Sequence, residues 1–221
     1  MFEDYHWFVV NTILMLAYGL QHSLLTTKTA MAVYSRFLPM ELWNILYSSL
    51  SIVLLIVAFV FWQSSGAVIY ELHGVAYYLA VGGMGLALFG FFYCFKYTTS
   101  FWQWIGLAQV YTMITKKEPS QYYRVRKDGP KKYVRFPHHT CLALLFWSQP
   151  VMTLDTLWLA IFATGYTYIG TMHQDSRGRR LLGEEWIEYS KSTNLMFPDP
   201  IRIVRDLIQG SYGRPATASK E

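Results

Sequence analysis

Side chains able to bind a ligand or move a proton gather at the edges of long apolar runs. Three such clusters occur, and they are Gln21, His22 and Ser23; Arg135, His138 and His139; and His173, Gln174 and Asp175. An ionisable group at membrane depth is costly and usually faces a cavity, so these clusters are candidates for a pocket that binds a ligand. A purely structural role at helix ends remains the alternative for each of them.

Other chemistries are less well supported. A metal or haem site built from His22, His138, His139 and His173 is possible, but the spacing contains no His-x-x-x-His pair, and we expect no metal. Nucleophilic catalysis is disfavoured because no Ser or Cys accompanies a recognisable base and orienting acid. Cys94 and Cys141 lie in or beside apolar runs. We expect them to be packed thiols rather than a disulfide or a metal pair.

The composition predicts a membrane protein. Of the 221 residues, 53% are hydrophobic and only 15% charged, against roughly 25% charged in an average soluble domain. The apolar runs are long enough for membrane helices, and Pro150 divides the last run in two. We therefore predict an all-α integral membrane protein with five transmembrane helices, the last two forming a hairpin. The predicted helices are 7–24, 42–63, 74–96, 138–150 and 153–173.

The positions of the cations predict an orientation. The 19 Lys and Arg residues fall in 25–41, in 96–140 and after 172, and none lies in 63–73. With the N-terminus outside and the C-terminus cytoplasmic, every cation lies on the cytoplasmic side, provided that the last run returns as a hairpin. The net charge of +5 then reflects orientation and contact with anionic lipid headgroups. Nucleic acid is not needed to explain it.

The remaining segments complete one domain over residues 1–208. A cytoplasmic segment at 97–137 contains Trp102, Trp104 and Tyr111, which favour the headgroup layer. A tail helix at 177–192, interrupted near Gly183, follows the last membrane run. Residues 209–221 are predicted to be disordered.

These motifs resemble a known family. "GPKKYVRFPHHTCLALLFWSQPVMT" and "HQDSRGRRLLGEEWIEYSKSTNLMFP" are similar to the C-terminal half of the integral membrane methyltransferases related to isoprenylcysteine carboxyl methyltransferase. "GLQHSLL", "GLAQVY" and "WSQPVMT" look like the branch that contains methanethiol S-methyltransferase and nurim. The resemblance covers about residues 15–200.

The resemblance implies a chemistry. It implies methyl transfer from S-adenosylmethionine to a small or lipophilic thiol, for which alignment of the acceptor and exclusion of water supply much of the rate. His22 and Gln21 would be the catalytic residues on the acceptor side, with His22 taking or orienting the thiol proton. The residues that would contact the donor are Arg135, His138, His139, Gln174 and Asp175.

The chain departs from the family pattern at the donor side. Phe136 replaces the His of the Arg-His-Pro pattern, and His139 stands where that pattern has Tyr. Gln174, Asp175 and Ser176 align with Glu-Glu-Arg. A non-catalytic, nurim-like scaffold or partner-binding protein is therefore the main alternative, and a haem- or metal-binding membrane protein the lesser one. The short connections favour a bacterial inner membrane.

Overall fold

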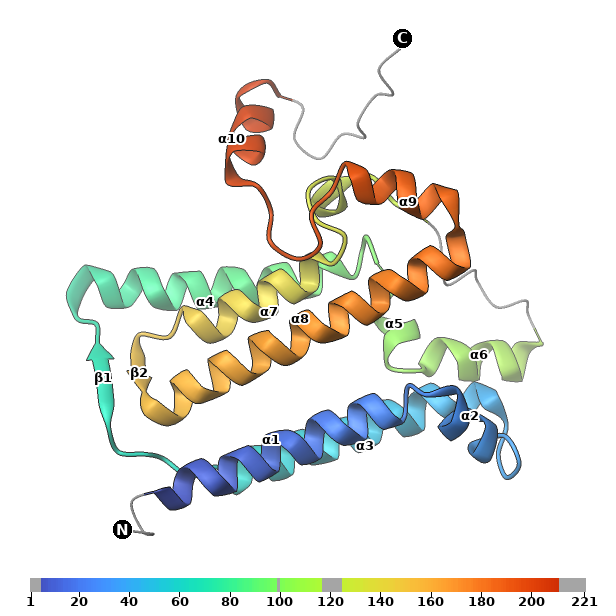
Figure 1. The fold of residues 1–221 in the computed structure, drawn as a ribbon, viewed down its shortest axis with the longest axis horizontal. Coiled ribbons are helices and arrows are strands. Elements are labelled where there is room, and N and C mark those ends of the chain that lie inside the picture. Colours follow the sequence, from blue (N-terminus) through green and yellow to red (C-terminus); the bar gives the residue numbers. More distant parts are fainter. Residues whose placement is uncertain (1–4, 99, 117–124, 211–221) are drawn as a thin grey trace. The chain divides into compact units, whose positions relative to one another are not determined.

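The computed structural model describes residues 5–98, 100–116 and 125–210, and it is mostly helical (Figure 1). The chain divides into two compact units. Unit 1 consists of Met1–Leu72, Ser100–Ser120 and Val151–Phe162. Unit 2 consists of His73–Thr99, Gln121–Pro150 and Ala163–Glu221. The acceptor-side candidates thus lie in unit 1 and the donor-side candidates in unit 2.

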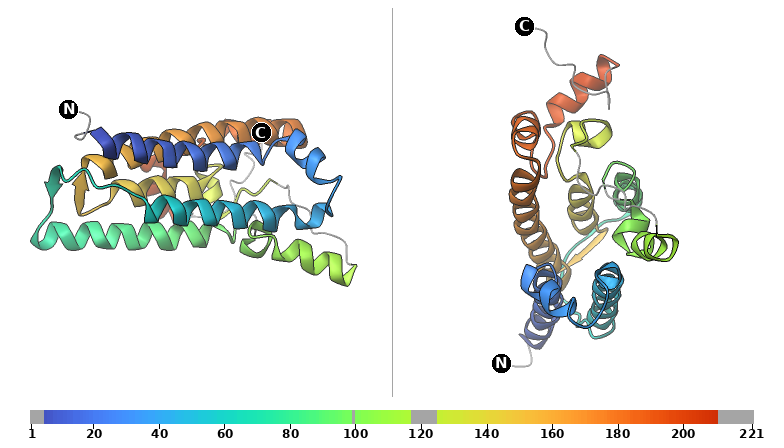
Figure 2. Two further views of the ribbon diagram at one scale, coloured as in Figure 1. Left: turned by 90° about the horizontal axis from the view of Figure 1, so that it is seen from below. Right: turned by 90° about the vertical axis from the view of Figure 1, so that its right-hand side faces the viewer.

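Two long helices form the body of unit 1. Helix α1 (His6–Leu24) packs beside α3 (Trp43–Val60), as the views in Figures 1 and 2 both show. Asn11 of α1 binds the segment that follows α3. Its Nδ2 donates to the Gln63 carbonyl at 2.8 Å, and its Oδ1 accepts from the Gln63 amide at 2.9 Å. The shorter helices of this unit are α2 (Lys28–Tyr34), η2 (Met40–Leu42), α5 (Phe101–Trp104) and α6 (Leu107–Thr115).

A small sheet in unit 1 was not predicted from the sequence. Strand β1 (Val68–Glu71) pairs antiparallel with β2 (Val151–Thr153). Next to it, the buried Asp155 carboxylate accepts hydrogen bonds from the Trp62 indole at 2.9 Å and from the Ser65 hydroxyl at 2.7 Å. Asp155 therefore anchors the start of α8 to the segment that follows α3.

In unit 2, α4 (Gly74–Cys94) packs against α7 (Pro137–Trp147). The two helices approach closely at Gly90, where an added Cβ atom would lie 2.9 Å from Cys141 Sγ. Cys94 is buried, Cys141 is partly buried, and both are free thiols. The chain then leaves the helix at Ser148 and enters the next one after β2, so the predicted break around Pro150 is confirmed.

The C-terminal elements differ from the prediction. Helix α8 (Leu154–Leu182) is continuous, where the sequence predicted an end at 173 and a new helix at 177. It contains no proline, and its polar last turns simply extend the same helix. The predicted interruption near Gly183 is confirmed, because Gly183 has φ 54° before α9 (Glu184–Lys191). Helix α10 (Pro200–Ile208) was not predicted, and 211–221 lie outside the described residues.

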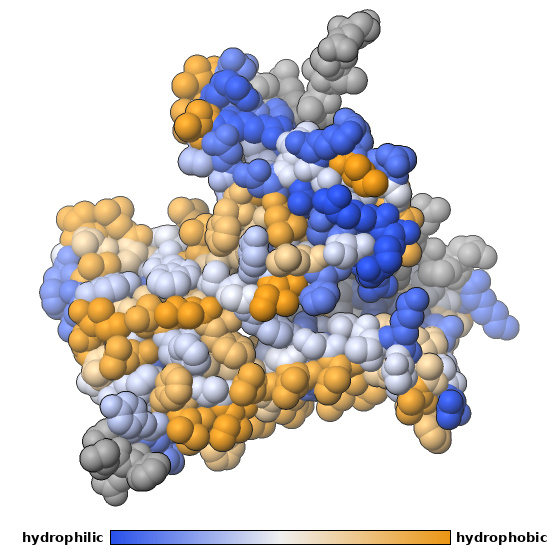
Figure 3. Space-filling view, viewed as in Figure 1, coloured by the Kyte–Doolittle hydropathy of each residue, from blue (hydrophilic) through white to orange (hydrophobic). Residues whose placement is uncertain are grey.

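Several helices suit a membrane. Within the described residues, Met40–Val60 and Gly74–Cys94 are long and apolar enough to cross, and the bent pair α1 and α2 makes a third if it is one broken span. Helix α7 has 11 residues, fewer than the roughly 20 of a regular crossing. Large apolar side chains lie exposed along these helices, and Figure 3 shows wide hydrophobic areas on one face. The apolar helices thus indicate a membrane protein.

Candidate functional site

Two backbone hydrogen bonds fix the position of Arg135 within unit 2. The Arg135 amide donates to the Asn194 carbonyl at 2.9 Å, and the Asn194 amide donates to the Tyr133 carbonyl at 3.1 Å. Phe136 then caps α7 in a non-helical conformation, as expected for a residue that precedes proline. The segment before α7 is thereby tied to the segment after α9.

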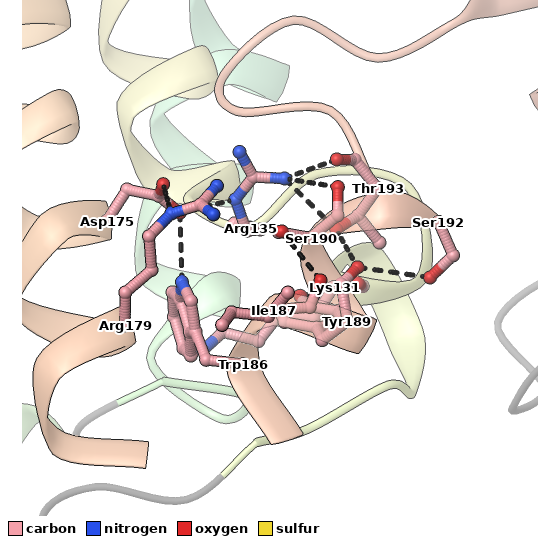
Figure 4. A network of polar contacts seen from close by, with 10 residues as sticks. All are labelled: Lys131, Arg135, Asp175, Arg179, Trp186, Ile187, Tyr189, Ser190, Ser192 and Thr193. Carbon is pink, nitrogen blue, oxygen red and sulfur yellow. Dashed lines mark hydrogen bonds and ion pairs between the residues drawn. The ribbon is translucent and has the colours of Figure 1, made fainter. Parts of the chain in front are cut away.

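The Arg135 side chain lies in a buried ionic network, shown in Figure 4. Its Nε lies 2.7 Å from Asp175 Oδ1 as an ion pair. Its Nη1 donates to the Ser190 carbonyl at 3.1 Å and to the Thr193 carbonyl. Nη2 makes no hydrogen bond with a described residue. One edge of the guanidinium is therefore left for a ligand.

Asp175 is fully engaged in the same network. Its Oδ1 accepts from the Trp186 indole at 2.9 Å, and its Oδ2 accepts from Arg179 Nε at 3.0 Å. Burial opposes ionisation, but the hydrogen bonds from Trp186 and Arg179 and the nearby charge of Arg135 outweigh it, so the pKa of Asp175 lies below its usual range. One carboxylate thus faces two guanidinium groups, and the network carries a surplus positive charge.

Glycine 178 makes room for this arrangement. A Cβ atom at Gly178 would lie 2.5 Å from the Trp186 ring, so only glycine lets α9 fold back this closely on α8. Trp186 packs with Phe136 and Tyr189 in the buried cluster of the unit. Phe136, which replaces the histidine of the family pattern, thus contributes packing beside the network.

The two adjacent histidines face different surroundings. His139 Nδ1 lies 2.8 Å from Thr171 Oγ1, and that hydroxyl already donates to the Thr167 carbonyl at 2.6 Å. Since the hydroxyl has a single proton, His139 Nδ1 carries the proton of their hydrogen bond. His138 instead lies near the rings of Phe91 and Phe95 of unit 2. Its Nδ1 is buried without a hydrogen-bond partner in the described part of the chain.

On the acceptor side, in unit 1, His22 meets residues of α3. The Tyr47 hydroxyl lies 2.6 Å from His22 Nε2 and 2.8 Å from Nδ1, so it faces the ring edge between the two nitrogens. The Tyr18 ring stacks on the His22 ring, with ring centroids 5.6 Å apart. Ser51 Oγ donates to the Tyr47 carbonyl and lies 3.4 Å from Gln21 Oε1. Gln21 Nε2 is buried with no hydrogen-bond partner among the described residues, and such an orphan donor suits an anionic ligand.

Comparison with known proteins identifies relatives of one activity. The chain is 26% identical to the methanethiol S-methyltransferase of Mycobacterium tuberculosis over 88% of this chain and 79% of the relative. It is 25% identical to the enzyme of the same name from Pseudomonas deceptionensis over 86% of this chain and 72% of the relative. Relatives that carry the name methanethiol S-methyltransferase thus match most of the chain at 24–26% identity. The resemblance found in the sequence is thus confirmed. No protein-family model and no solved structure matches the chain.

The structure brings some of the predicted site residues together and leaves others exposed. Arg135 and Asp175 lie together, as do His22 and Gln21, whereas His173 and Gln174 are exposed. The residues that sequence reasoning missed are Tyr47, Arg179 and Trp186. Arg179 follows Asp175 by one helical turn, and that spacing could have revealed the pair. In the described part of the chain, no group of three or more His, Cys, Asp and Glu side chains could hold a metal ion.

The basic stretch 126–135, which lies within the predicted cytoplasmic segment 97–137, is partly buried. Lys132 and Arg135 are buried and paired with Asp206 and Asp175. Lys127 is exposed. Two cations of this stretch therefore stabilise unit 2 itself.

Lys131 predicts a pH dependence of stability. Burial, reinforced by the nearby charge of Arg126, lowers the pKa of Lys131 from 10.5 to about 8. Between these values the unfolded chain binds more protons than the folded one, so the free energy of unfolding should rise with pH from about 8 to 10.5. Lys131→Met should raise the thermal midpoint in detergent at neutral pH and flatten the rise, whereas exposed Lys127→Met should change neither. A midpoint of the parent chain that falls across this window contradicts the assignment.

Proposed function

We propose that the chain is an S-adenosylmethionine-dependent membrane methyltransferase that converts a small, methanethiol-like thiol into a methyl thioether. The observation that carries the proposal is the buried network in which Arg135 and Arg179 share the single carboxylate of Asp175. Surplus positive charge with an unused N–H edge suits the carboxylate of the methyl donor. The 24–26% identity to enzymes named for this activity supports it.

Each candidate residue of unit 2 would have its own role in binding the methyl donor. Arg135 would donate from Nη2 to the donor's carboxylate. Asp175 would position Arg135 rather than touch the donor, because both of its oxygens are already engaged. His138, with its unpartnered Nδ1, and His139 would line the donor side. Gln174 is exposed and is the least favoured of the predicted contacts.

The residues of unit 1 would serve the acceptor. His22 would take the thiol proton while Tyr47 holds the imidazole ring in place, and Gln21 Nε2 would donate to the developing thiolate. The sulfonium donor supplies a good leaving group. Methyl transfer therefore needs chiefly the alignment of the thiolate with the methyl group and the exclusion of water.

The membrane arrangement belongs to the same proposal. We infer a multi-pass protein with five crossings, in which α7 and the first part of α8 form the last two on either side of the Pro150 break. The concentration of Lys and Arg after residue 96 favours an outside N-terminus and a cytoplasmic C-terminus. A bacterial inner membrane fits the bacterial relatives with the printed name.

A direct assay tests the activity. Purified chain in detergent is incubated with S-adenosylmethionine and methanethiol, and S-adenosylhomocysteine and dimethyl sulfide are measured. Both products should appear in equal amounts and depend on both substrates. Absence of both, together with absence of saturable S-adenosylmethionine binding in calorimetry, would leave the non-catalytic scaffold as the better account.

Arg135 gives the sharpest test of the donor assignment. Arg135→Lys keeps a cation beside Asp175 but loses the Nη2 edge, so S-adenosylmethionine binding should weaken by roughly ten-fold or more, as expected for loss of a hydrogen bond to a charged group. Calorimetry measures this dissociation constant. Arg180→Gln, which removes an exposed cation of α8 that makes no contact in this network, is the matched control and should bind as well as the parent. Equal affinity of Arg135→Lys and the parent would refute the assignment.

A further inference from the structure

Helix α10 is amphipathic in the reverse sense to a helix of a water-soluble protein. Its polar side faces the rest of unit 2: Asp206 is buried and lies 2.8 Å from Lys132 Nζ, and it accepts from the Tyr133 hydroxyl at 3.1 Å. The Arg202 guanidinium lies 5.7 Å from the centre of the Tyr133 ring. The helix is therefore attached to the protein through charged and polar groups.

The opposite side of α10 is apolar and exposed. Ile201 is 77% exposed, Val204 54%, Leu207 55% and Ile208 81%. At helical spacing these four side chains form one continuous strip, which we call the α10 apolar strip. Transfer of such a strip from water into an apolar medium is favourable, so its exposure to water would be unfavourable.

The surroundings of α10 within unit 2 indicate what covers the strip. Helix α10 runs across α4 and α7 rather than along them (Figures 1 and 2). In Figure 3 the hydrophobic atoms of α10 lie on its left, the direction in which α4 extends toward Gly74, and the hydrophilic atoms lie on its right. Helix α4 is itself a candidate membrane span. The strip thus points toward the N-terminal part of this candidate span, and the polar side points toward its C-terminal part.

Cations border the strip. The Arg205 side chain is 61% exposed, and Arg202 and Arg205 lie on the polar side of the helix. This order of an apolar face with flanking cations is the pattern of helices that lie in the headgroup layer of anionic bilayers. We propose that α10 is an interfacial helix whose apolar strip enters an anionic phospholipid bilayer and whose exposed Arg205 contacts lipid phosphates.

The consequence concerns the donor side. Lys132 and Tyr133, which hold Asp206 of α10, immediately precede Val134 and Arg135. A bilayer-bound α10 therefore fixes the depth of the Arg135 segment relative to the membrane surface. The inference rests on the membrane location of the chain and not on its catalytic activity.

The test uses the full chain in phospholipid nanodiscs. Ile208→Cys carries an environment-sensitive nitrobenzoxadiazole label on the strip, and Glu188→Cys on the exposed side of α9 is the matched control. The parent chain, treated with the same reagent, gives the background from Cys94 and Cys141. The label at position 208 should emit at shorter wavelength and be quenched by lipids with a nitroxide on the upper acyl chain, whereas the label at 188 should show neither effect.

The outcomes separate the possible occupants. If the label at 208 behaves like the one at 188, the proposal is overturned. It is also overturned if the label at 208 is shielded, is not quenched by lipid nitroxides and changes with the number of chains per disc, because that result indicates contact with a second copy. In discs that contain phosphatidylglycerol, Arg205→Gln should lower the ratio of bilayer-immersed to exposed label about five-fold, the contribution of one cation near an anionic surface. An equal effect in pure phosphatidylcholine overturns the role of the arginine. A methyl-transferring chain with an unquenched label would refute only this inference, whereas an inactive chain with a quenched label would refute only the proposed function.

Discussion

Asp175→Ala is expected to lower the free energy of unfolding by about 3–5 kcal/mol, the range for removing one partner of a buried ion pair. The Asp175 side chain is 11% exposed and that of Arg135 8%. The variant leaves the Arg135 guanidinium without its counter-ion and the Trp186 indole without its acceptor. For a chain of this size, each kcal/mol corresponds to about 2–4 °C in the thermal midpoint, which can be measured in detergent.

Two further variants show where that loss originates. Arg179→Gln removes only the exposed partner and should cost about 0.5 kcal/mol or less, because its side chain is 45% exposed. Arg135→Met combined with Asp175→Ala removes both charges, and it should be more stable than Asp175→Ala alone. If the double variant is as unstable as the sum of the single ones, the two side chains do not form a coupled pair.

Low pH should also lower the free energy of unfolding. The pKa of Asp175 is lowered, so the ion pair adds stability that is fully present above the usual carboxyl pKa and is lost as the pH falls through the folded value. Asp206, whose pKa is lowered chiefly by its hydrogen bond from Lys132, acts in the same direction. The two carboxylates link different helices to the segment that carries Arg135. Asp175 links α8 to it, and Asp206 links α10.

The sequence predicted the parts of this structure that depend on long, regular patterns. Apolar runs and Pro150 located the main helices, and Gly183 located the interruption before α9. The strand pair β1 and β2 could not be predicted, because its strands have only four and three residues and are too short for a periodic signal. Helix α10 could not be predicted because its nine residues are too few for a clear helical period and follow Pro198 and Pro200, which favour a loop.

The candidate site was predictable in its residue types but not in its connections. Arg135 and Asp175 are far apart in sequence, and the ion pair between them depends on how α7 and α8 lie within unit 2. In the proposed site, Asp175 therefore positions Arg135 instead of contacting the donor. Tyr47 was similarly hidden, because its contact with His22 requires the packing of α3 on α1.

His22→Ala should lower kcat/KM for methyl transfer to methanethiol by about 10²–10⁴ at neutral pH, the usual contribution of a positioned general base. The thiolate is the nucleophile, and a thiol with a pKa near that of free cysteine, about 8.5, is mostly protonated at neutral pH. In the proposed mechanism His22 accepts that proton, and the Tyr47 hydroxyl, 2.6 Å from His22 Nε2, holds the imidazole ring in place. The loss should therefore appear mainly where the substrate arrives as a thiol.

The pH dependence separates catalysis by His22 from mere packing. As the pH rises, more of the substrate arrives as thiolate and needs no base, so the ratio of parent to His22→Ala rates should shrink steadily. Tyr47→Phe, which keeps the ring contact but loses the hydroxyl, should give a smaller loss with the same trend. Ser51→Ala is the control, because its hydroxyl lies 3.4 Å from His22 Nδ1 and is already donated to the Tyr47 carbonyl. A loss in His22→Ala that stays constant with pH would mean that the imidazole only supports the packing of α1 on α3, because a structural defect acts equally on thiol and thiolate.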